Sequence, residues 1–249
     1  MEGSWTNFWL SEAIRNAVQL ALAYALGLWV LRGGIRVNYT RKVLHFALFF
    51  VPIGLITWLP YRGGIDTAFF SSLTFLATVA LMSAPLRGRF PALGVAFAAF
   101  DRPEDRPYTL RWLATQILAT YLVLLAVLVG LERYDKVALI YITMLVVAIG
   151  DGLAEPVGVR FGRHAYRTRA LFTERTYVRT LEGSACVLLS GFLAVYVMRG
   201  QLAPQQFLPA LAVIPAAMTL AEAWSPHTWD GPFLYGAGGL STIAILELA

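Results

Sequence analysis

Charged residues are scarce in this chain of 249 residues: Asp, Glu, Lys and Arg together make up 14% of it, against about 25% in an ordinary soluble domain. Hydrophobic residues account for 58%, and the mean hydropathy is +0.62. A soluble fold of this size cannot hide so much apolar side chain, so the excess is expected to face lipid. The composition therefore excludes a secreted disulfide scaffold, a disordered tail and an ordinary cytosolic enzyme.

Cysteine and lysine are also rare. The single Cys186 excludes an intrachain disulfide and a cysteine-based metal site. The two lysines, Lys42 and Lys136, do not follow a glycine-rich loop, so the chain has no P-loop. Protein-kinase motifs, the H-E-x-x-H zinc motif and the G-x-S-x-G elbow are missing as well. Any phosphoryl chemistry is therefore expected to use an architecture specific to membranes.

The chain contains several long runs of apolar residues. A helix needs about 20 mainly apolar residues to cross the hydrocarbon core. Such runs predict spans at residues 13–31, 43–60, 67–84, 110–131, 137–155, 181–198, 207–223 and 232–248. The last run is short and rich in glycine, so seven spans and eight are both consistent, and residues 90–100 are too short to cross. The sequence predicts an all-α, polytopic helical bundle that forms one integral membrane domain over residues 1–249.

Basic residues are distributed unequally between the predicted loops. Fifteen of the 20 lie on one side: Arg32, Arg36, Arg41, Lys42, Arg87, Arg89, Arg102, Arg106, Arg111, Arg160, Arg163, Arg167, Arg169, Arg175 and Arg179. The opposite loops hold Arg62, Arg133, Lys136 and Arg199, and Arg15 lies near the N-terminus. Because basic loops stay cytoplasmic, a multi-pass protein with its N-terminus outside the cell membrane is expected. Topology then accounts for the net charge of +5, and no nucleic-acid partner is expected.

Ionisable residues within apolar spans are costly and indicate function by default. Six such residues lie in or next to the predicted spans: His45, Asp151, Glu155, Glu182, Glu222 and Asp230. Each maps to the predicted cytoplasmic end of its span. This coincidence points to a functional site at that face.

The densest constellation is IGDGLAEPVGVRFG, residues 149–162. Asp151 and Glu155 are four residues apart and share one helix face. Glycines on both sides of Asp151 loosen the helix, and Pro156 is expected to end it. Paired carboxylates suit Mg²⁺, which takes one or two of them together with substrate phosphates. The alternative, in which the two acids cap a helix or pair with the arginines that follow, stays open.

A second constellation, RTYVRTLEGS, precedes a predicted span, so Arg179 lies beside a helix N-terminus. Both features favour phosphate oxygens. The stretch RKVLHF places Lys42 and His45 three residues apart, where both can point into one cleft. The tail AEAWSPHTWDGP adds Glu222 and Asp230.

These stretches resemble the CTP-dependent lipid-alcohol kinases of the phytol kinase and dolichol kinase type, which are distantly related to CDP-diacylglycerol synthases. The resemblance rests on RKVLH, GDGLAEPVGVRFG, RTLEGS and the two tail acids, and it covers most of the chain. The chain departs from the family in having Glu155 where phytol kinases tend to have Asp, and Arg179-Thr180 where they tend to have Lys-Ser. Gly231 follows Asp230 where related kinases tend to have Asn. These departures leave the identity of the lipid open.

The resemblance implies transfer of the γ-phosphoryl of CTP to the hydroxyl of an isoprenoid alcohol, with Mg²⁺ as cofactor. It implies catalytic roles for Asp151, Glu182 and His45, with Glu182 or His45 accepting the alcohol proton. It implies nucleotide or phosphate binding by Arg41, Lys42, Gly150, Gly152, Gly158, Gly162, Arg179, Gly183 and Ser184, and metal binding by Asp151, Glu155, Glu222 and Asp230. The expected partners are CTP, a membrane isoprenoid alcohol and the lipid bilayer.

Two other functions fit parts of this pattern. A membrane cytidylyltransferase would use the same nucleotide to make a CDP-lipid and would release pyrophosphate instead of CDP. A lipid or small-molecule transporter would place charged residues near the midplane, with broken helices in both halves. In this sequence the acids of the motifs cluster at one predicted interface, which counts against transport.

Overall fold

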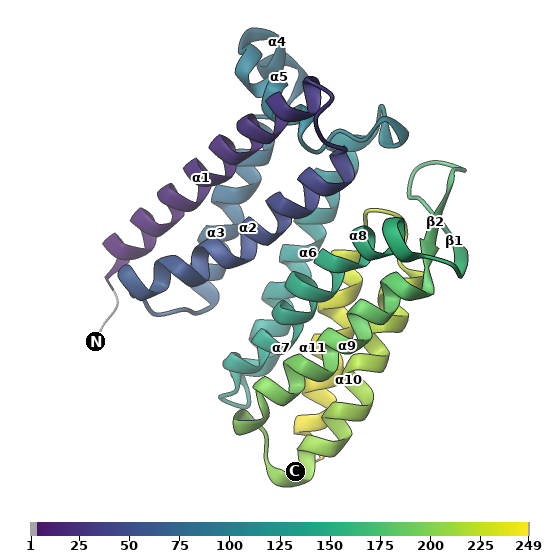
Figure 1. Ribbon diagram of the computed structural model, residues 1–249. Helices are drawn as coiled ribbons and strands as arrows, with labels where there is room; N and C mark the ends of the chain where they lie inside the picture. The colour runs from purple at the N-terminus through teal and green to yellow at the C-terminus, as the bar shows by residue number, and fades with distance from the viewer. Residues whose placement is uncertain (1–3, 249) are drawn as a thin grey trace. The chain divides into compact units, whose positions relative to one another are not determined.

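The computed structural model describes residues 4–248, and they are mainly helical (Figure 1). Five helices in this range are long and apolar enough to cross a membrane: Trp5–Leu31, Val37–Trp58, Thr109–Glu132, Val137–Phe161 and Pro204–Trp224. The predicted class is therefore confirmed in its coarser form, a mainly helical chain with several helices long and apolar enough to cross a membrane. The total of seven or eight spans stays a prediction, because Ile65–Ala80 and Leu181–Val197 are apolar but shorter.

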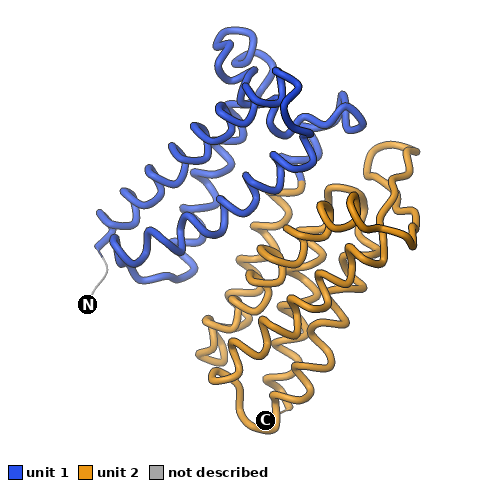
Figure 2. Tube along the Cα trace, in the orientation of Figure 1, with its two compact units in different colours: residues 1–115 blue, residues 116–249 orange. Residues whose placement is uncertain are grey.

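By internal contacts the chain separates into two compact units, Met1–Thr115 and Gln116–Ala249 (Figure 2). Unit 1 contains α1 (Trp5–Leu31), α2 (Val37–Trp58), α3 (Ile65–Ala80), α4 (Ala84–Arg89), α5 (Pro91–Ala98) and the start of α6 (Thr109–Glu132). Unit 2 contains the rest of α6, α7 (Ile140–Leu145), α8 (Gly152–Phe161), β1 (Ala165–Arg169), β2 (Thr176–Thr180), α9 (Leu181–Val197), α10 (Pro204–Trp224) and α11 (Asp230–Leu246). Short 3₁₀ turns lie at Pro103–Asp105, Val137–Leu139 and Arg199–Gln201. The single domain expected from the sequence stays a prediction.

The first helix corrects the expected start of the first span. Ser4 caps α1, since its Oγ accepts a hydrogen bond from the amide of Asn7 at 3.2 Å, and the helix begins at Trp5 instead of near residue 13. Glu12 and Arg15 therefore lie inside an apolar helix, where they are buried and paired at 2.6 Å. The ionisable residues of the spans are thus not confined to the set expected from the sequence.

The region between α3 and α6 agrees with the expectation that residues 90–100 are too short to cross. It forms α4 and the eight-residue α5, and α5 packs against α1. The approach is close, because a Cβ on Gly27 would lie 2.8 Å from the carbonyl carbon of Val95. Ala96 and Phe97 are buried there.

In unit 2, α10 packs against α9 and α11, and α9 packs against α8 and the segment that precedes it. That segment, Val146–Asp151, is π-helical, which matches the expected loosening around Asp151. The expectation that Pro156 ends the helix is wrong, because α8 continues through Pro156 to Phe161. Proline removes one backbone hydrogen bond, but the packing of α8 against α9 holds the rest of the turn.

A β-hairpin between α8 and α9 is the one departure from the all-α class in residues 4–248. Strands β1 and β2 pair antiparallel, with Tyr166 opposite Arg179 and Thr168 opposite Tyr177. From its arginines alone, this stretch is expected only to be a basic loop. Its tyrosine, threonine and valine residues favour strands, and they explain the hairpin.

The close packing of the π-helical segment predicts that adding one methyl group at Gly150 lowers the stability of the protein. A Cβ on Gly150 would lie 2.9 Å from the Cα of Val187 and in closer conflict with the Oγ of Ser190. We expect Gly150→Ala to destabilise the protein by about 1–3 kcal/mol through overpacking, measured as a lower unfolding midpoint in detergent. Gly54→Ala is the matched control, because no heavy atom lies within 4 Å of its Cβ and alanine favours a helix interior. Equal shifts for the two variants would contradict this account.

Candidate functional site

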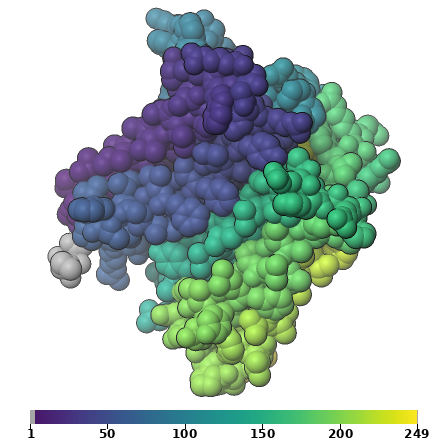
Figure 3. Space-filling view, in the orientation of Figure 1, coloured from purple at the N-terminus to yellow at the C-terminus, as the bar shows by residue number. Residues whose placement is uncertain are grey.

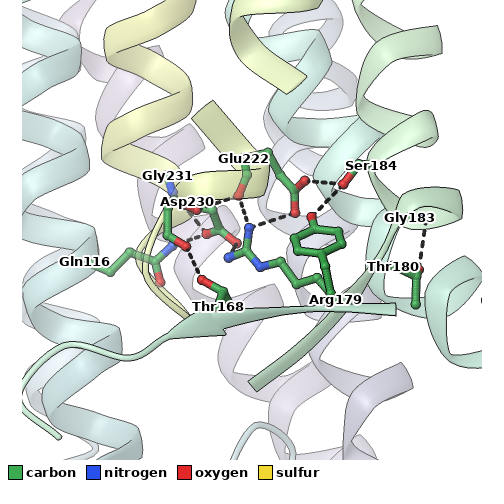
Figure 4. A network of polar contacts seen from close by, with 11 residues as sticks. Gln116, Thr168, Arg179, Thr180, Gly183, Ser184, Glu222, Asp230 and Gly231 are labelled. Atoms are coloured by element: carbon green, nitrogen blue, oxygen red, sulfur yellow. Dashed lines mark hydrogen bonds and ion pairs between the residues drawn. The ribbon is translucent and has the colours of Figure 1, made fainter. Parts of the chain in front are cut away.

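Arg179 is the centre of a polar network at the end of unit 2 (Figure 4). Its Nη1 lies 2.9 Å from Oε1 of Glu222 and also donates to the backbone carbonyl of Glu222. Its Nη2 lies 3.8 Å from Oδ2 of Asp230. The side chains of Arg179 and Glu222 are only 12% and 6% exposed. Strand β2, the end of α10 and the start of α11 thus supply one guanidinium and two carboxylates to a single site.

Ser184 and Tyr166 extend the network to α9 and β1. The hydroxyl of Ser184 donates to Oε2 of Glu222 at 2.8 Å, and the phenol of Tyr166 lies 2.8 Å from the same hydroxyl. Because the Ser184 hydroxyl already donates its hydrogen to Glu222, the phenol of Tyr166 is the donor in its hydrogen bond with Ser184. The result is a directed chain of donors from Tyr166 through Ser184 to the carboxylate.

The phenol of Tyr166 predicts a pH effect on stability. Burial raises the pKa of Tyr166 above 10.0, so the folded protein favours the protonated phenol. Its contribution to stability is therefore complete below pH 10.0 and is lost as the pH rises through the folded-state pKa. We expect Tyr166→Phe to lose about 1 kcal/mol at neutral pH. It should also reduce the fall in the unfolding midpoint in alkali, measured as a series of melts with the wild type alongside. An unchanged alkaline fall in Tyr166→Phe would contradict this assignment.

Asp230 is held on its other side by α6. The amide of Gln116 donates to Oδ1 of Asp230 at 3.2 Å, and the backbone N–H of Gly231 donates to the same oxygen at 3.0 Å. A Cβ on Gly231 would lie 3.2 Å from the side-chain nitrogen of Gln116. A larger residue after Asp230 would therefore press on the group that orients its carboxylate.

The loop between α10 and α11 is anchored to the hairpin. Thr168 Oγ1 donates to the carbonyl of Ser225 at 2.8 Å, and Ser225 Oγ donates to the carbonyl of Glu222, also at 2.8 Å. The backbone N–H of His227 donates to the carbonyl of Arg169 at 2.7 Å, and its ring stacks on Tyr177 with centroids 3.6 Å apart. The hairpin thus holds the loop that joins the helix of Glu222 to the helix of Asp230.

Asp151 and Glu155 lie half-buried one turn apart, where the π-helical segment joins α8. Asp151 and Asp230 are both close enough to act electrostatically on Glu222. Carboxylates from two separate sequence motifs are therefore gathered in one region of unit 2. Arg179 supplies the positive charge next to two of them.

Glu182 faces away from this network and pairs with His164, a residue outside the set predicted from the sequence. Oε1 of Glu182 lies 2.7 Å from Nδ1 of His164, and Oε2 accepts from the backbone N–H of His164 at 3.4 Å. Thr180 caps α9, as its Oγ1 accepts from the N–H of Gly183 at 3.2 Å. Glu182 and its neighbours thus join the base of the hairpin to the first turn of α9.

The glycines predicted to bind nucleotide lie mainly where α8, α9 and the hairpin pack closely. A Cβ on Gly158 would lie 2.8 Å from Oγ1 of Thr180, and Gly162 also lies against Thr180. A Cβ on Gly183 would lie 2.7 Å from the carbonyl oxygen of Ala154. Gly152, the first residue of α8, is buried. Packing of α8 on α9 and the hairpin explains these small residues, while their nucleotide binding stays a prediction.

Arg41, Lys42 and His45 belong to α2 of unit 1. This helix begins at Val37, so all three lie in its first three turns instead of at the edge of a span that begins at residue 43. Arg41 lies 3.5 Å from Oδ2 of Asp105, and the His45 ring lies 5.1 Å from that of Phe49. Their catalytic and phosphate-binding roles stay predictions.

The four carboxylates predicted to bind Mg²⁺ differ in how well their surroundings suit that role. No group of three or more His, Cys, Asp or Glu within residues 4–248 lies close enough together to hold a metal ion. Glu222 and Asp230 flank the Arg179 guanidinium, which offsets their charge. Asp151 and Glu155 provide the one or two carboxylates that Mg²⁺ takes when phosphates supply its remaining ligands. Of the four predicted ligands, these two fit a nucleotide-bound magnesium best.

The members of the network that sequence reasoning missed are Gln116, Tyr166, Thr168 and Ser225. Gln116 lies in α6, Tyr166 and Thr168 lie in β1, and Ser225 follows α10 within the stretch AEAWSPHTWDGP. A polar residue in an apolar span, such as Gln116, was the one available signal.

Comparison with known proteins gives no assignment for this chain: no protein-family model, curated protein or solved structure matches it.

Proposed function

We propose that the protein is a membrane kinase that transfers the γ-phosphoryl of CTP to the hydroxyl of an isoprenoid alcohol, with Mg²⁺. The observation that carries the proposal is the Arg179–Glu222–Ser184 network, with Asp151 and Asp230 beside it, at the end of otherwise apolar helices. So much buried charge in such a protein is costly unless it serves a ligand or a reaction. The resemblance of the motifs to lipid-alcohol kinases supplies the nucleotide and the class of alcohol.

Phosphoryl transfer depends mainly on positioning and on stabilising the charge of the transferred group. In the proposal, Asp151 and Glu155 would hold magnesium, which neutralises phosphate charge when bound. Arg179 would contact phosphate oxygens through the planar fork of its guanidinium. Glu222 and Asp230 would hold that guanidinium in place, because they already fix two of its sides.

The alcohol oxygen would attack the γ-phosphorus, the bond to the β-phosphate oxygen would break, and CDP would leave. The alcohol proton would pass to the carboxylate of Glu182 or the imidazole of His45. Glu182 is accessible from outside the buried network, in agreement with a proton acceptor that must then release its proton to water. Lys42 and Arg41 would contact phosphates.

In the proposed orientation the N-terminus lies outside the cell and the hairpin lies at the cytoplasmic face, where CTP is present. The isoprenoid tail would enter from the bilayer between apolar helices. Only the hydroxyl would then need to reach the charged end of unit 2.

The proposal is tested with the purified full-length protein in lipid nanodiscs, Mg²⁺ and each of the four nucleoside triphosphates labelled at the γ-phosphate. A panel of phytol, farnesol, a long polyprenol and diacylglycerol serves as acceptors. We expect labelled lipid phosphate and unlabelled CDP with CTP and one of the isoprenoid alcohols. Transfer to none of the acceptors would overturn the proposal.

The same assay separates the two other functions. A cytidylyltransferase would release labelled pyrophosphate and leave the lipid unlabelled at the γ-position. A transporter would move lipid or solute in proteoliposomes without nucleotide and would give no labelled product.

A further inference from the structure

The β1–β2 hairpin has two chemically different faces. Side chains alternate along each strand, so Tyr166, Thr168 and Arg179 share one face, which binds the site and the loop after α10. The other face carries Arg167 and Arg169, together with Val178 opposite Arg167. We call these last three residues the outer face of the hairpin.

The outer face is exposed and mixes cationic and apolar side chains. Arg167 and Arg169 are exposed, and Val178 is 69% exposed. Phe172, in the turn of the hairpin, is 51% exposed. Figure 3 shows the green segment that follows α8 at the surface of the molecule. Because the inner face is already occupied by the protein, the outer face is the one available to a partner.

The charge of this segment has one sign. Residues 160–179 contain six arginines and a single acid, Glu174. Arg179 is offset by Glu222 and Asp230, so five arginines face one carboxylate. Such a surface is complementary to an anionic partner. The exposed Val178 and Phe172 between the charges favour an amphiphilic one.

The hairpin is attached at both ends to helices with exposed apolar side chains. Its two ends continue into α8 and α9, whose adjoining residues Phe161 and Leu181 are each 60% exposed. Exposed phenylalanine and leucine beside a segment rich in arginine suit the boundary between hydrocarbon and headgroups. A five-residue strand spans about 17 Å, so the outer-face arginines lie within reach of headgroups at that boundary.

We propose that the outer face of the β1–β2 hairpin binds anionic lipid headgroups, with Arg167 and Arg169 contacting their phosphates and Phe172 and Val178 entering the interface. Sequence reasoning gave Arg167 and Arg169 only a part in setting orientation. The orientation of a protein in the membrane depends on how many basic residues lie on each side. Binding to headgroups depends instead on whether the basic residues lie on one face of the hairpin. The proposal rests on membrane insertion alone and does not depend on the kinase activity.

The test uses full-length protein with Cys186→Ala and Thr176→Cys, labelled at residue 176 with an environment-sensitive fluorophore; Thr176 is exposed and lies next to the outer face. The protein is placed in nanodiscs of phosphatidylcholine with increasing fractions of phosphatidylglycerol. We expect a blue shift, and quenching by spin-labelled lipid, that grow with the anionic fraction and decline with salt. Each arginine near an anionic surface strengthens partition by about fivefold, so Arg167→Gln/Arg169→Gln should weaken headgroup binding by about 25-fold.

Arg133→Gln/Arg199→Gln is the matched control, because it removes the same charge from the other end of the unit 2 helices. Its response should equal that of the parent protein. An equal response in pure phosphatidylcholine, or an equal loss in the control, would overturn the proposal. So would the same blue shift produced by inorganic pyrophosphate in detergent, which would identify a soluble phosphate ligand instead of a lipid. Unchanged unfolding midpoints in both double variants show that a lost response is not a loss of fold.

Discussion

Asp151→Asn is expected to lower CTP-dependent transfer to the lipid alcohol by about 10²–10³-fold, the usual loss when one electrostatic contact with the reacting group is removed. The substitution keeps the shape of the side chain and removes the charge that would hold magnesium and its nucleotide. Asp151 is also the residue at which the π-helical segment becomes α8, so its position is set by the backbone and survives the change. The measurement is kcat/KM for CTP with the acceptor identified in the nanodisc assay.

Asp135→Asn is the matched control for this experiment. Asp135 is exposed, lies in the turn after α6 and has a φ of 55°, a conformation that asparagine accepts readily. We expect it to retain the full rate. Wild-type transfer by Asp151→Asn would contradict the assignment, and an equal loss in Asp135→Asn would show that the effect is not specific to the site.

Arg179→Met is expected to be the most destabilising single substitution in the network. It leaves the Glu222 carboxylate buried without its charged partner, and breaking a buried pair in this way costs about 3–5 kcal/mol. For a chain of this length each kcal/mol corresponds to roughly 2–4 °C, so the unfolding midpoint should fall by about 6–20 °C. The measurement is a thermal melt in detergent at one fixed scan rate, because the midpoint of an irreversible transition depends on the scan rate.

The double variant Arg179→Met/Glu222→Gln separates charge from packing. If the uncompensated carboxylate causes the loss, the double variant should recover much of the lost stability, and the cycle should give a coupling between the two residues. The unfolding midpoint of Arg179→Lys should lie between those of the wild type and Arg179→Met, since lysine keeps the positive charge but lacks the planar, forked donors of the guanidinium. Arg160→Gln, at an exposed position on α8, is the surface control and should change stability by about 0.5 kcal/mol or less. A midpoint for Arg179→Met equal to that of the control would contradict the burial argument.

The sequence was sufficient to predict the class of protein, because the apolar composition of a chain does not depend on its tertiary structure. It also indicated the loosened helix around Asp151, since the local glycines act through the backbone. It did not indicate where α1 begins. The cap at Ser4 lies eight residues before the buried Glu12, and only packing against α3 makes a charged pair acceptable inside that helix.

Pairing across the chain could not be predicted. Arg179 and Glu222 are 43 residues apart, and Gln116 and Asp230 are 114 apart, so no local pattern joins them. Glu182 lies only three residues from Arg179, yet it pairs with His164, because β2 and the first turn of α9 direct the two side chains to opposite sides. Adjacency in a motif is therefore a poor guide to adjacency in the site.

By itself the sequence determined a mainly helical chain with apolar helices long enough to cross a membrane, and it indicated where the scarce acids and arginines lie along those helices. Those conclusions depend on composition and on spacing within single helices, which sequence records directly. The tertiary structure decided which charged side chains pair and which face of the hairpin is exposed. It also explains why α8 and α9 have glycine where they pack together. Each of these depends on close contact between segments far apart in the chain, where a difference of one ångström separates a hydrogen bond from none.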